Sequence, residues 1–153
     1  MKPLYIFDLD GTLANIEHRK HILEEKHDGQ RWRRFYAACD KDKPIPAVIA
    51  TMERLRHFAD IWIFSGRSEE VRDKTVSWLL AHTSFMSHDL DTVLMMRQEG
   101  DYRTDNIVKQ EWWNNMLDED RQRLVAVFDD RNQVVAMWRS ENVPCFQVAP
   151  GDF

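Results

Sequence analysis

The sequence predicts an α/β protein in which a parallel sheet is covered by helices on both faces. Short apolar runs alternate with longer amphipathic segments, which is typical of strands alternating with helices. The runs are apolar at nearly every position, as expected for strands buried on both faces. Polar clusters directly follow three of them. The expected strands are residues 4–7, 61–64, 93–96, 124–128 and 145–148.

Helices are expected between these strands. Pro46 suits the first position of one helix, because its ring fixes a helical φ angle and that position needs no N–H donor. Thr104 or Asp105 can begin another helix, since both residue types are good N-caps. Two more helices are expected after residues 67 and 131, with apolar faces that include Val71, Trp78, Leu79, Val134, Val135 and Trp138.

Residues 14–45 form the one polar insertion, and we expect a small helical cap there. Asn15 can cap a first short helix, and a second carries Trp32, Phe35 and Tyr36. These aromatic residues either pack the cap against the body, which is the more common arrangement, or stack on a nucleobase. The insertion has eight Lys/Arg and six Asp/Glu, hence +2, so the rest of the −5 chain carries −7. A basic cap over an acidic body suits an anionic substrate.

Size and composition fit one compact domain, 1–153, of 43% hydrophobic residues. The net charge argues against a basic groove along many phosphates, yet recognition of a single strand end needs few cations. No apolar run approaches the ~20 residues that span a membrane, so a cytoplasmic protein is expected. Cys39 and Cys145 match no metal or redox spacing and are expected to be reduced, partly buried thiols. The oligomeric state is left open.

The polar clusters are Asp8 with Asp10, Ser65 with Arg67, and Asp129 with Asp130, listed here in chain order. Each follows a different expected strand. The carboxyl ends of parallel strands meet at one edge of a sheet, which is where ligands bind in open α/β folds. We therefore expect the three clusters to form one site.

The segment Asp8-Leu9-Asp10-Gly11-Thr12-Leu13 resembles the first motif of the haloacid-dehalogenase (HAD) family. Ser65 matches the second motif of that family, Lys109 the third, and Asp129-Asp130 the fourth, in the same order. The resemblance implies a three-layer, HAD-like (Rossmannoid) parallel sheet with a small cap inserted after the first strand. It also implies a phosphatase.

Each of these residues has a chemical role to match. Asp8 can attack phosphorus and form an aspartyl-phosphate, which divides one very slow hydrolysis into two easier steps. Asp10 can protonate the leaving alkoxide and later accept a proton from water. Ser65 can hydrogen-bond the phosphoryl group, and Lys109 can neutralise charge. Asp105 lies one helical turn before Lys109 and is expected to pair with it.

The expected acidic residues would repel one another strongly without a cation between them. Mg²⁺ is expected at Asp8, at the backbone carbonyl of Asp10, and at Asp129, Asp130 or both, because hard oxygen ligands suit this ion. Gly11 permits the tight turn after the first strand.

A closer resemblance is to the 3′-phosphatase domain of bacteriophage polynucleotide kinase/3′-phosphatase. It is carried by Phe128-Asp129-Asp130-Arg131, Gln133-Val134-Val135, Met137-Trp138-Arg139, Cys145, Gln147-Val148-Ala149 and Gly151-Asp152-Phe153. Upstream it includes Gln98-Glu99-Gly100-Asp101, Arg103, Asp105 and Val108-Lys109. It implies removal of a 3′-phosphate from DNA or RNA ends, with Arg67 and Arg19 binding the substrate phosphate. Thr12, Gly66 and Asp105 complete the expected substrate-binding set. No Gly-x-x-x-x-Gly-Lys-Ser/Thr loop is present, so no kinase activity is expected.

Two other functions stay open. One is a phosphatase of small nucleotides or other phosphorylated metabolites, because the HAD fold hosts many substrates. The other is a module that binds phosphorylated ends without catalysis, against which the complete set of motif residues argues.

Overall fold

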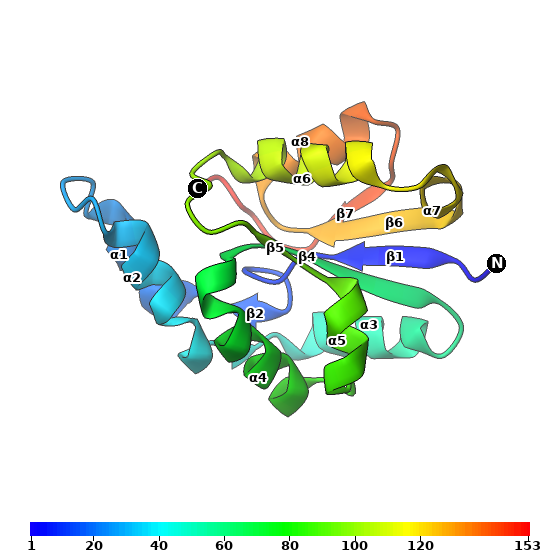
Figure 1. The fold of residues 1–153 in the computed structure, drawn as a ribbon, viewed down its shortest axis with the longest axis horizontal. Helices are drawn as coiled ribbons and strands as arrows, with labels where there is room; N and C mark the ends of the chain where they lie inside the picture. Colours follow the sequence, from blue (N-terminus) through cyan, green and yellow to red (C-terminus); the bar gives the residue numbers. More distant parts are fainter.

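A five-stranded parallel sheet forms the middle layer of the protein in a computed structural model that describes residues 1–153 (Figure 1). Its order is β5–β4–β1–β6–β7, and all neighbouring strands pair in parallel. The strands are β1 (Leu4–Phe7), β4 (Asp60–Ser68), β5 (Leu94–Arg97), β6 (Leu124–Asp129) and β7 (Cys145–Gln147). The predicted α/β class and parallel sheet are confirmed.

Helices cover both faces of this sheet, as Figure 1 shows. On one face α6 (Asp105–Asn115) and α8 (Asn132–Ser140) pack over a core that includes Ile6 and Trp138. The other face carries α3 (Pro46–Arg56), α4 (Arg72–His82) and α5 (Ser87–Val93), whose core includes Phe7. Successive strand residues such as Ile6 and Phe7 thus enter opposite cores, which explains why the strands are apolar at every position.

In the body, three elements differ from the sequence-based expectation. Strand β4 continues to Ser68, so Ser65 and Arg67 lie within the strand rather than after it. Helices α5 and α7 (Asp118–Arg123) were not predicted. They have seven and six residues, and α7 has no buried residue, so neither leaves a helical apolar period in the sequence.

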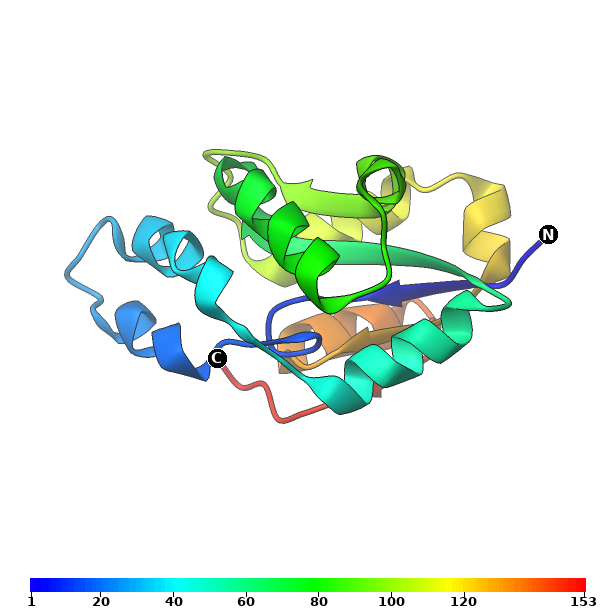
Figure 2. The ribbon, with the colours of Figure 1, turned by 90° about the horizontal axis from the view of Figure 1, so that it is seen from below.

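The insertion leaves and rejoins the body through a two-stranded antiparallel stem of β2 (Ala14–Asn15) and β3 (Lys43–Pro44). Beyond the stem lie the 3₁₀ turns Glu17–Arg19 and Cys39–Lys41 and the short helices α1 (His21–Glu24) and α2 (Arg31–Ala37). Asn15 lies in β2 and caps no helix; its Oδ1 instead accepts a hydrogen bond from the Glu17 N–H at 2.9 Å. Figures 1 and 2 show this cap beyond the carboxyl ends of the strands.

The cap has a small apolar core of its own, formed by Ile16, Ile22 and Phe35. Trp32 and Tyr36 are half-buried and pack against that core. Phe35 therefore packs within the cap. The expected packing of the cap against the body is confirmed for Tyr36, which also packs against the body core that includes Phe7. Trp32 and Tyr36 keep part of their rings accessible.

Two smaller expectations can be compared with the structure. Cys39 and Cys145 are both free and buried, as expected. No helix has the length and apolar character needed to cross a membrane.

Candidate active site

A buried lysine joins two of the predicted clusters. Lys109 Nζ donates to Asp8 Oδ1 and to Asp129 Oδ2, each at 2.7 Å. Asp8 follows β1, Asp129 ends β6, and Lys109 comes from the middle of α6, so three elements converge at the carboxyl edge of the sheet. All three residues are at most 5% exposed. A charged group buried this deeply requires a partner of opposite charge, and each of these residues has one.

The acidic side of this cluster exceeds what one lysine can neutralise. Carboxylate oxygens of Asp8, Asp129 and Asp130 lie within 4.8 Å of one another. Burial, with the neighbouring Asp129 adding to it, raises the pKa of Asp130 to about 7 and the pKa of Asp8 well above its usual range. Three buried carboxylates beside a single ammonium group fit a hard divalent cation with oxygen ligands.

Gly11 brings the backbone close to this acidic cluster. Its φ is +81°, a conformation that other residues rarely adopt, and a Cβ there would lie 2.1 Å from Asp130 Oδ2. The adjacent Thr12 Oγ1 donates to Asp8 Oδ2 at 3.0 Å. The structure thus places Thr12, which was expected to bind substrate, on the carboxylate of Asp8.

The Asp10 side chain is held by two arginines. Its Oδ1 accepts from Arg19 Nη2 and Arg67 Nε, each at 2.8 Å. Both arginines are fully buried. Burial alone would raise the pKa of Asp10, but the Arg67 and Arg19 guanidiniums outweigh that effect and hold the pKa below its usual value.

The same two arginines bind Asp42, a buried cap residue to which the sequence analysis gave no role. Asp42 Oδ2 accepts from Arg19 Nη2 at 2.6 Å and from Arg67 Nη2 at 2.8 Å, and Oδ1 faces His18 Nε2 at 2.7 Å. Asp42 lies in Cys39-Asp40-x-Asp42, the one part of the insertion that fits the family resemblance, but its pattern indicated no chemical role. The expected contact of Arg19 and Arg67 with a substrate phosphate stays a prediction.

Strand β4 contributes Ser65 and Gly66. Ser65 is 1% exposed, and its Oγ accepts a hydrogen bond from the Arg67 N–H at 3.2 Å. The Gly66 carbonyl accepts from the Tyr36 hydroxyl at 3.1 Å and from Arg97 Nε at 2.8 Å. Body and cap therefore meet at Gly66 as well as at Asp42.

The expected pair between Asp105 and Lys109 is wrong. Asp105 forms ion pairs with Arg97 and, at 2.9 Å, with Arg131 Nη1. It is the first residue of α6, where its side chain turns toward arginines of β5 and of the loop after β6. A Cβ on Gly66 would lie 2.5 Å from Asp105 Oδ1, so Gly66 leaves room for this carboxylate. The role of Arg97 was not foreseen, because it follows an apolar run without a recognisable motif.

The C-terminal residues close one side of the site. Gly151 packs on the loop after β6, where a Cβ would lie 2.1 Å from the Asp130 carbonyl oxygen. Arg131 Nε donates to the Phe153 carbonyl oxygen at 2.6 Å, and Lys20 Nζ lies 4.7 Å from the centre of the Phe153 ring. These contacts give the Gly-Asp-Phe segment a structural function beside the acidic cluster.

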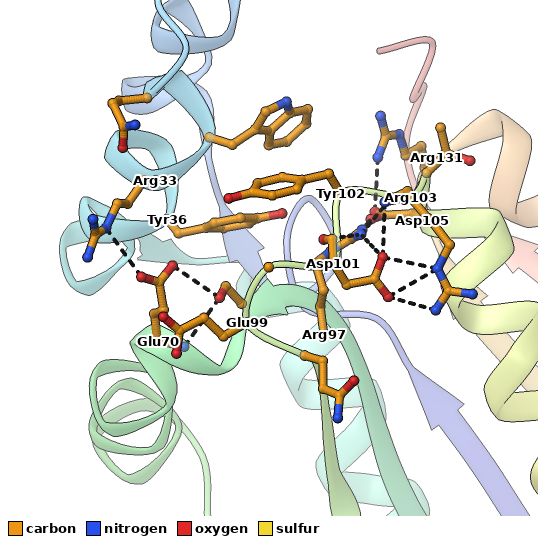
Figure 3. A pocket seen from close by; sticks show the side chains of 16 residues that line it. Arg33, Tyr36, Glu70, Arg97, Glu99, Asp101, Tyr102, Arg103, Asp105 and Arg131 are labelled. Atoms are coloured by element: carbon orange, nitrogen blue, oxygen red, sulfur yellow. Dashed lines mark hydrogen bonds and ion pairs between the residues drawn. The ribbon is translucent and has the colours of Figure 1, made fainter.

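A small cavity of about 30 Å³ lies above the carboxylates of Asp8, Asp10, Asp129 and Asp130. Cap residues and Phe153 form its upper wall. A larger cavity of about 420 Å³ adjoins it, and the two share Trp32, Tyr36, Asp105 and Arg131 in their linings (Figure 3).

Fold and site together are those of a HAD-type phosphatase. The chain belongs to the family described as the polynucleotide kinase PNKP phosphatase domain, whose sequence profile matches residues 2–153. It is 33% identical over 139 residues to a protein of Autographa californica nuclear polyhedrosis virus described as a bifunctional polynucleotide kinase/RNA ligase. That alignment covers 90% of this chain and 18% of the viral protein.

Solved structures agree with this assignment. A chain from the Pnkp1/Rnl/Hen1 RNA repair complex is 32% identical, with a TM-score of 0.74 over 99% of this chain and 44% of that chain. The class C acid phosphatase of Bacillus anthracis has a TM-score of 0.62 at 14% identity, covering 99% of this chain and 68% of that one, which shows a shared fold. The present chain thus spans less than half of its repair-complex relative.

Proposed function

We propose that residues 1–153 act as one Mg²⁺-dependent phosphomonoesterase domain that removes 3′-phosphates from DNA or RNA ends. Residues 14–45 serve as its cap. The observation that carries the proposal is the buried Lys109 held between Asp8 and Asp129, because it combines a candidate nucleophile, a counter-charge and a candidate metal ligand. The names of the relatives, a polynucleotide kinase/RNA ligase and an RNA repair complex, support nucleic acid as the substrate.

Asp8 is the proposed nucleophile. One of its carboxylate oxygens forms a bond to phosphorus while the bond from phosphorus to the leaving oxygen breaks. Lys109 and Thr12, which donate to different oxygens of Asp8, fix the carboxylate in one orientation. Water then attacks phosphorus in the acyl phosphate, which frees Asp8 and inorganic phosphate. Ser65 is the proposed hydrogen-bond donor to the phosphoryl group.

Asp10 is the proposed acid and base. It gives its proton to the departing alkoxide in the first step and takes one from water in the second. An acid must hold a proton, whereas Arg19 and Arg67 favour the ionised form of Asp10. A phosphate dianion bound nearby opposes the effect of these arginines, so substrate binding itself raises the pKa of Asp10 toward the acid role.

Mg²⁺ fits the oxygen donors of Asp8, Asp129 and Asp130, with Asp10 offering its backbone carbonyl. Bound there, the ion would neutralise charge on the carboxylates and on the phosphoryl oxygens. Either or both of Asp129 and Asp130 serve as ligands in this proposal.

Phosphate release from a 3′-phosphorylated oligonucleotide, with and without Mg²⁺, tests the proposal. Asp8→Asn should abolish release, because an amide is a poor nucleophile, while the exposed Asp118→Asn should leave it unchanged. An active Asp8→Asn protein would contradict the covalent mechanism. A wild-type protein that binds the oligonucleotide and releases no phosphate would favour the binding module instead.

The competing function, a phosphatase of small nucleotides, is tested with 3′- and 5′-mononucleotides in the same assay. The proposal predicts a higher kcat/KM for the oligonucleotide than for either mononucleotide. Equal or faster turnover of the mononucleotides would favour the small-molecule phosphatase.

A further inference from the structure

The larger of the two cavities has no part in the chemistry described above. It lies between cap helix α2 and the loop of residues 98–104 that joins β5 to α6 (Figure 3). Its volume of about 420 Å³ is within the ~300–1,000 Å³ typical of small-molecule sites. It therefore has room for a ligand group larger than a phosphate.

Three aromatic residues line this cavity from two sides. The rings of Trp32 and Tyr36 lie on the cap side with their centres 5.9 Å apart, and the Tyr36 hydroxyl is fixed by the Gly66 carbonyl. Figure 3 shows the side chains of Tyr36 and Tyr102 entering the cavity from opposite directions. Tyr102 is 85% exposed and packs against no other aromatic ring. An exposed ring facing a cavity gives a flat group a surface on which to stack.

The larger cavity lies beside the small cavity over Asp8, and this position indicates which flat group would stack there. Trp32, Tyr36, Asp105 and Arg131 line both cavities, so the two are neighbours. A phosphate held over Asp8 would thus place the nucleoside that carries it next to the aromatic side chains.

The charges around the larger cavity favour stacking over phosphate binding. Four arginines and four acidic residues line it, so their formal charges cancel: Arg33, Arg97, Arg103, Arg131, Glu70, Glu99, Asp101 and Asp105. The two most exposed arginines already have acidic partners, Arg33 with Glu70 at 3.2 Å and Arg103 with Asp101 at 2.7 Å. Paired arginines offer little attraction to a strand of phosphates.

We propose that this cavity is a nucleobase subsite, in which the base of the phosphate-bearing nucleotide stacks between Tyr102 and the Trp32–Tyr36 wall. The inference rests on the proposed function, since the reacting phosphate must lie in the catalytic cavity. Stacking of this kind tolerates any base, because every base has a π face. Tyr102 is then a determinant of specificity for nucleotides over phosphates that lack a base.

Binding to the Asp8→Asn protein in Mg²⁺ tests the proposal without turnover. The probe is an oligonucleotide that ends in a 2-aminopurine 3′-phosphate, whose fluorescence is quenched by stacking. Binding is followed separately through a dye at the 5′ end. Introducing Tyr102→Ala into the Asp8→Asn protein should abolish the quenching and weaken binding by roughly 5- to 150-fold, the usual range for one lost base stack. Tyr102 is exposed, so its removal should leave the fold intact.

Two matched variants and a second probe isolate the effect. Tyr102→Phe keeps the ring and should behave as the parent. Phe58→Ala removes an aromatic ring that is 56% exposed in the turn between α3 and β4, and it should change nothing. A probe with an abasic terminal nucleotide should bind the parent and Tyr102→Ala proteins equally. Bound 2-aminopurine without quenching, or equal weakening of both probes by Tyr102→Ala, would overturn the subsite.

Phosphate release by the wild-type protein distinguishes an error in the proposed subsite from an error in the proposed function. If the wild-type protein releases no phosphate from a 3′-phosphorylated oligonucleotide, the proposed function is wrong. If it releases phosphate equally well from base-bearing and abasic ends, only the subsite is wrong.

Discussion

Asp10 in the body and Asp42 in the cap share one pair of buried arginines. Arg19 and Arg67 each donate to both carboxylates, over distances of 2.6–2.8 Å. The candidate acid of the reaction is thus held through contacts that cross from the body to the cap. This connection makes the cap a part of the catalytic geometry as well as a cover.

Replacing Asp42 should therefore damage both stability and activity. Asp42→Ala leaves two buried guanidiniums with one carboxylate between them, and breaking a buried ion pair costs about 3–5 kcal/mol. Urea unfolding should show a loss of this size together with a lower kcat. The neighbouring Asp40→Ala is the control, because Asp40 is half-exposed and lies 3.6 Å from an exposed Lys74, a contact worth about 0–1 kcal/mol. Similar losses for both variants would show that Asp42 has no special role.

Mg²⁺ should raise the melting temperature of the protein. A ligand that binds only the folded state stabilises it by ~2.7 kcal/mol at a concentration 100 times its dissociation constant. The shift should shrink in Asp130→Asn, which removes one carboxylate from the buried cluster. Differential scanning calorimetry at several Mg²⁺ concentrations measures it, with Asp118→Asn as the control. An undiminished shift in Asp130→Asn would place the ion elsewhere or assign its binding to Asp129.

Gly151→Ala should lower activity although Gly151 belongs to no catalytic motif. The added methyl group would meet the Asp130 backbone and force the loop that carries Asp130 to move. Displacement of a catalytic group by about 1 Å can cost ~10²-fold in rate. Gly29→Ala is the matched control, since a Cβ there meets no atom within 4 Å. Wild-type kcat/KM in Gly151→Ala would show that the loop tolerates the shift.

The two thiols should be unreactive near neutral pH. Burial raises the pKa of Cys145 to about 12 and also raises the pKa of Cys39, so the reactive thiolate form is scarcer than for a free cysteine, whose pKa is ~8.5. Iodoacetamide at pH 8 should leave the folded protein unmodified and label both cysteines in urea, as read by mass spectrometry. Labelling should increase only as the pH rises toward the raised pKa values. Rapid labelling of native protein at pH 8 would contradict this.

The sequence predicted the sheet and the acidic centre because both depend on local patterns. A buried strand followed at once by Asp8 or Asp129 can be recognised in ten residues, and parallel topology then brings those residues together. Asp42 could not be found in this way, since its partners Arg19 and Arg67 lie 23 and 25 residues away in the sequence. Arg97 reaches Asp105 through the shape of the loop between β5 and α6, which no periodic pattern predicts. The predicted Asp105–Lys109 pair is wrong because helical spacing permits a contact without requiring it. Lys109 binds Asp8 and Asp129 instead, and Asp105 pairs with Arg97 and Arg131.

The small cavity over the carboxylates also limits which phosphates can react. Its volume is about 30 Å³, against about 420 Å³ for the adjoining cavity, so a group attached to the phosphate has room on the side of the larger cavity. A terminal phosphate has one substituent, which can extend toward the larger cavity. A phosphate inside a strand carries a second nucleoside, for which the small cavity offers no comparable room. Under the proposed function, the domain would thus remove the phosphate at a strand end and leave the phosphodiester linkages within the same strand intact. A phosphatase of this shape would not act as a nuclease.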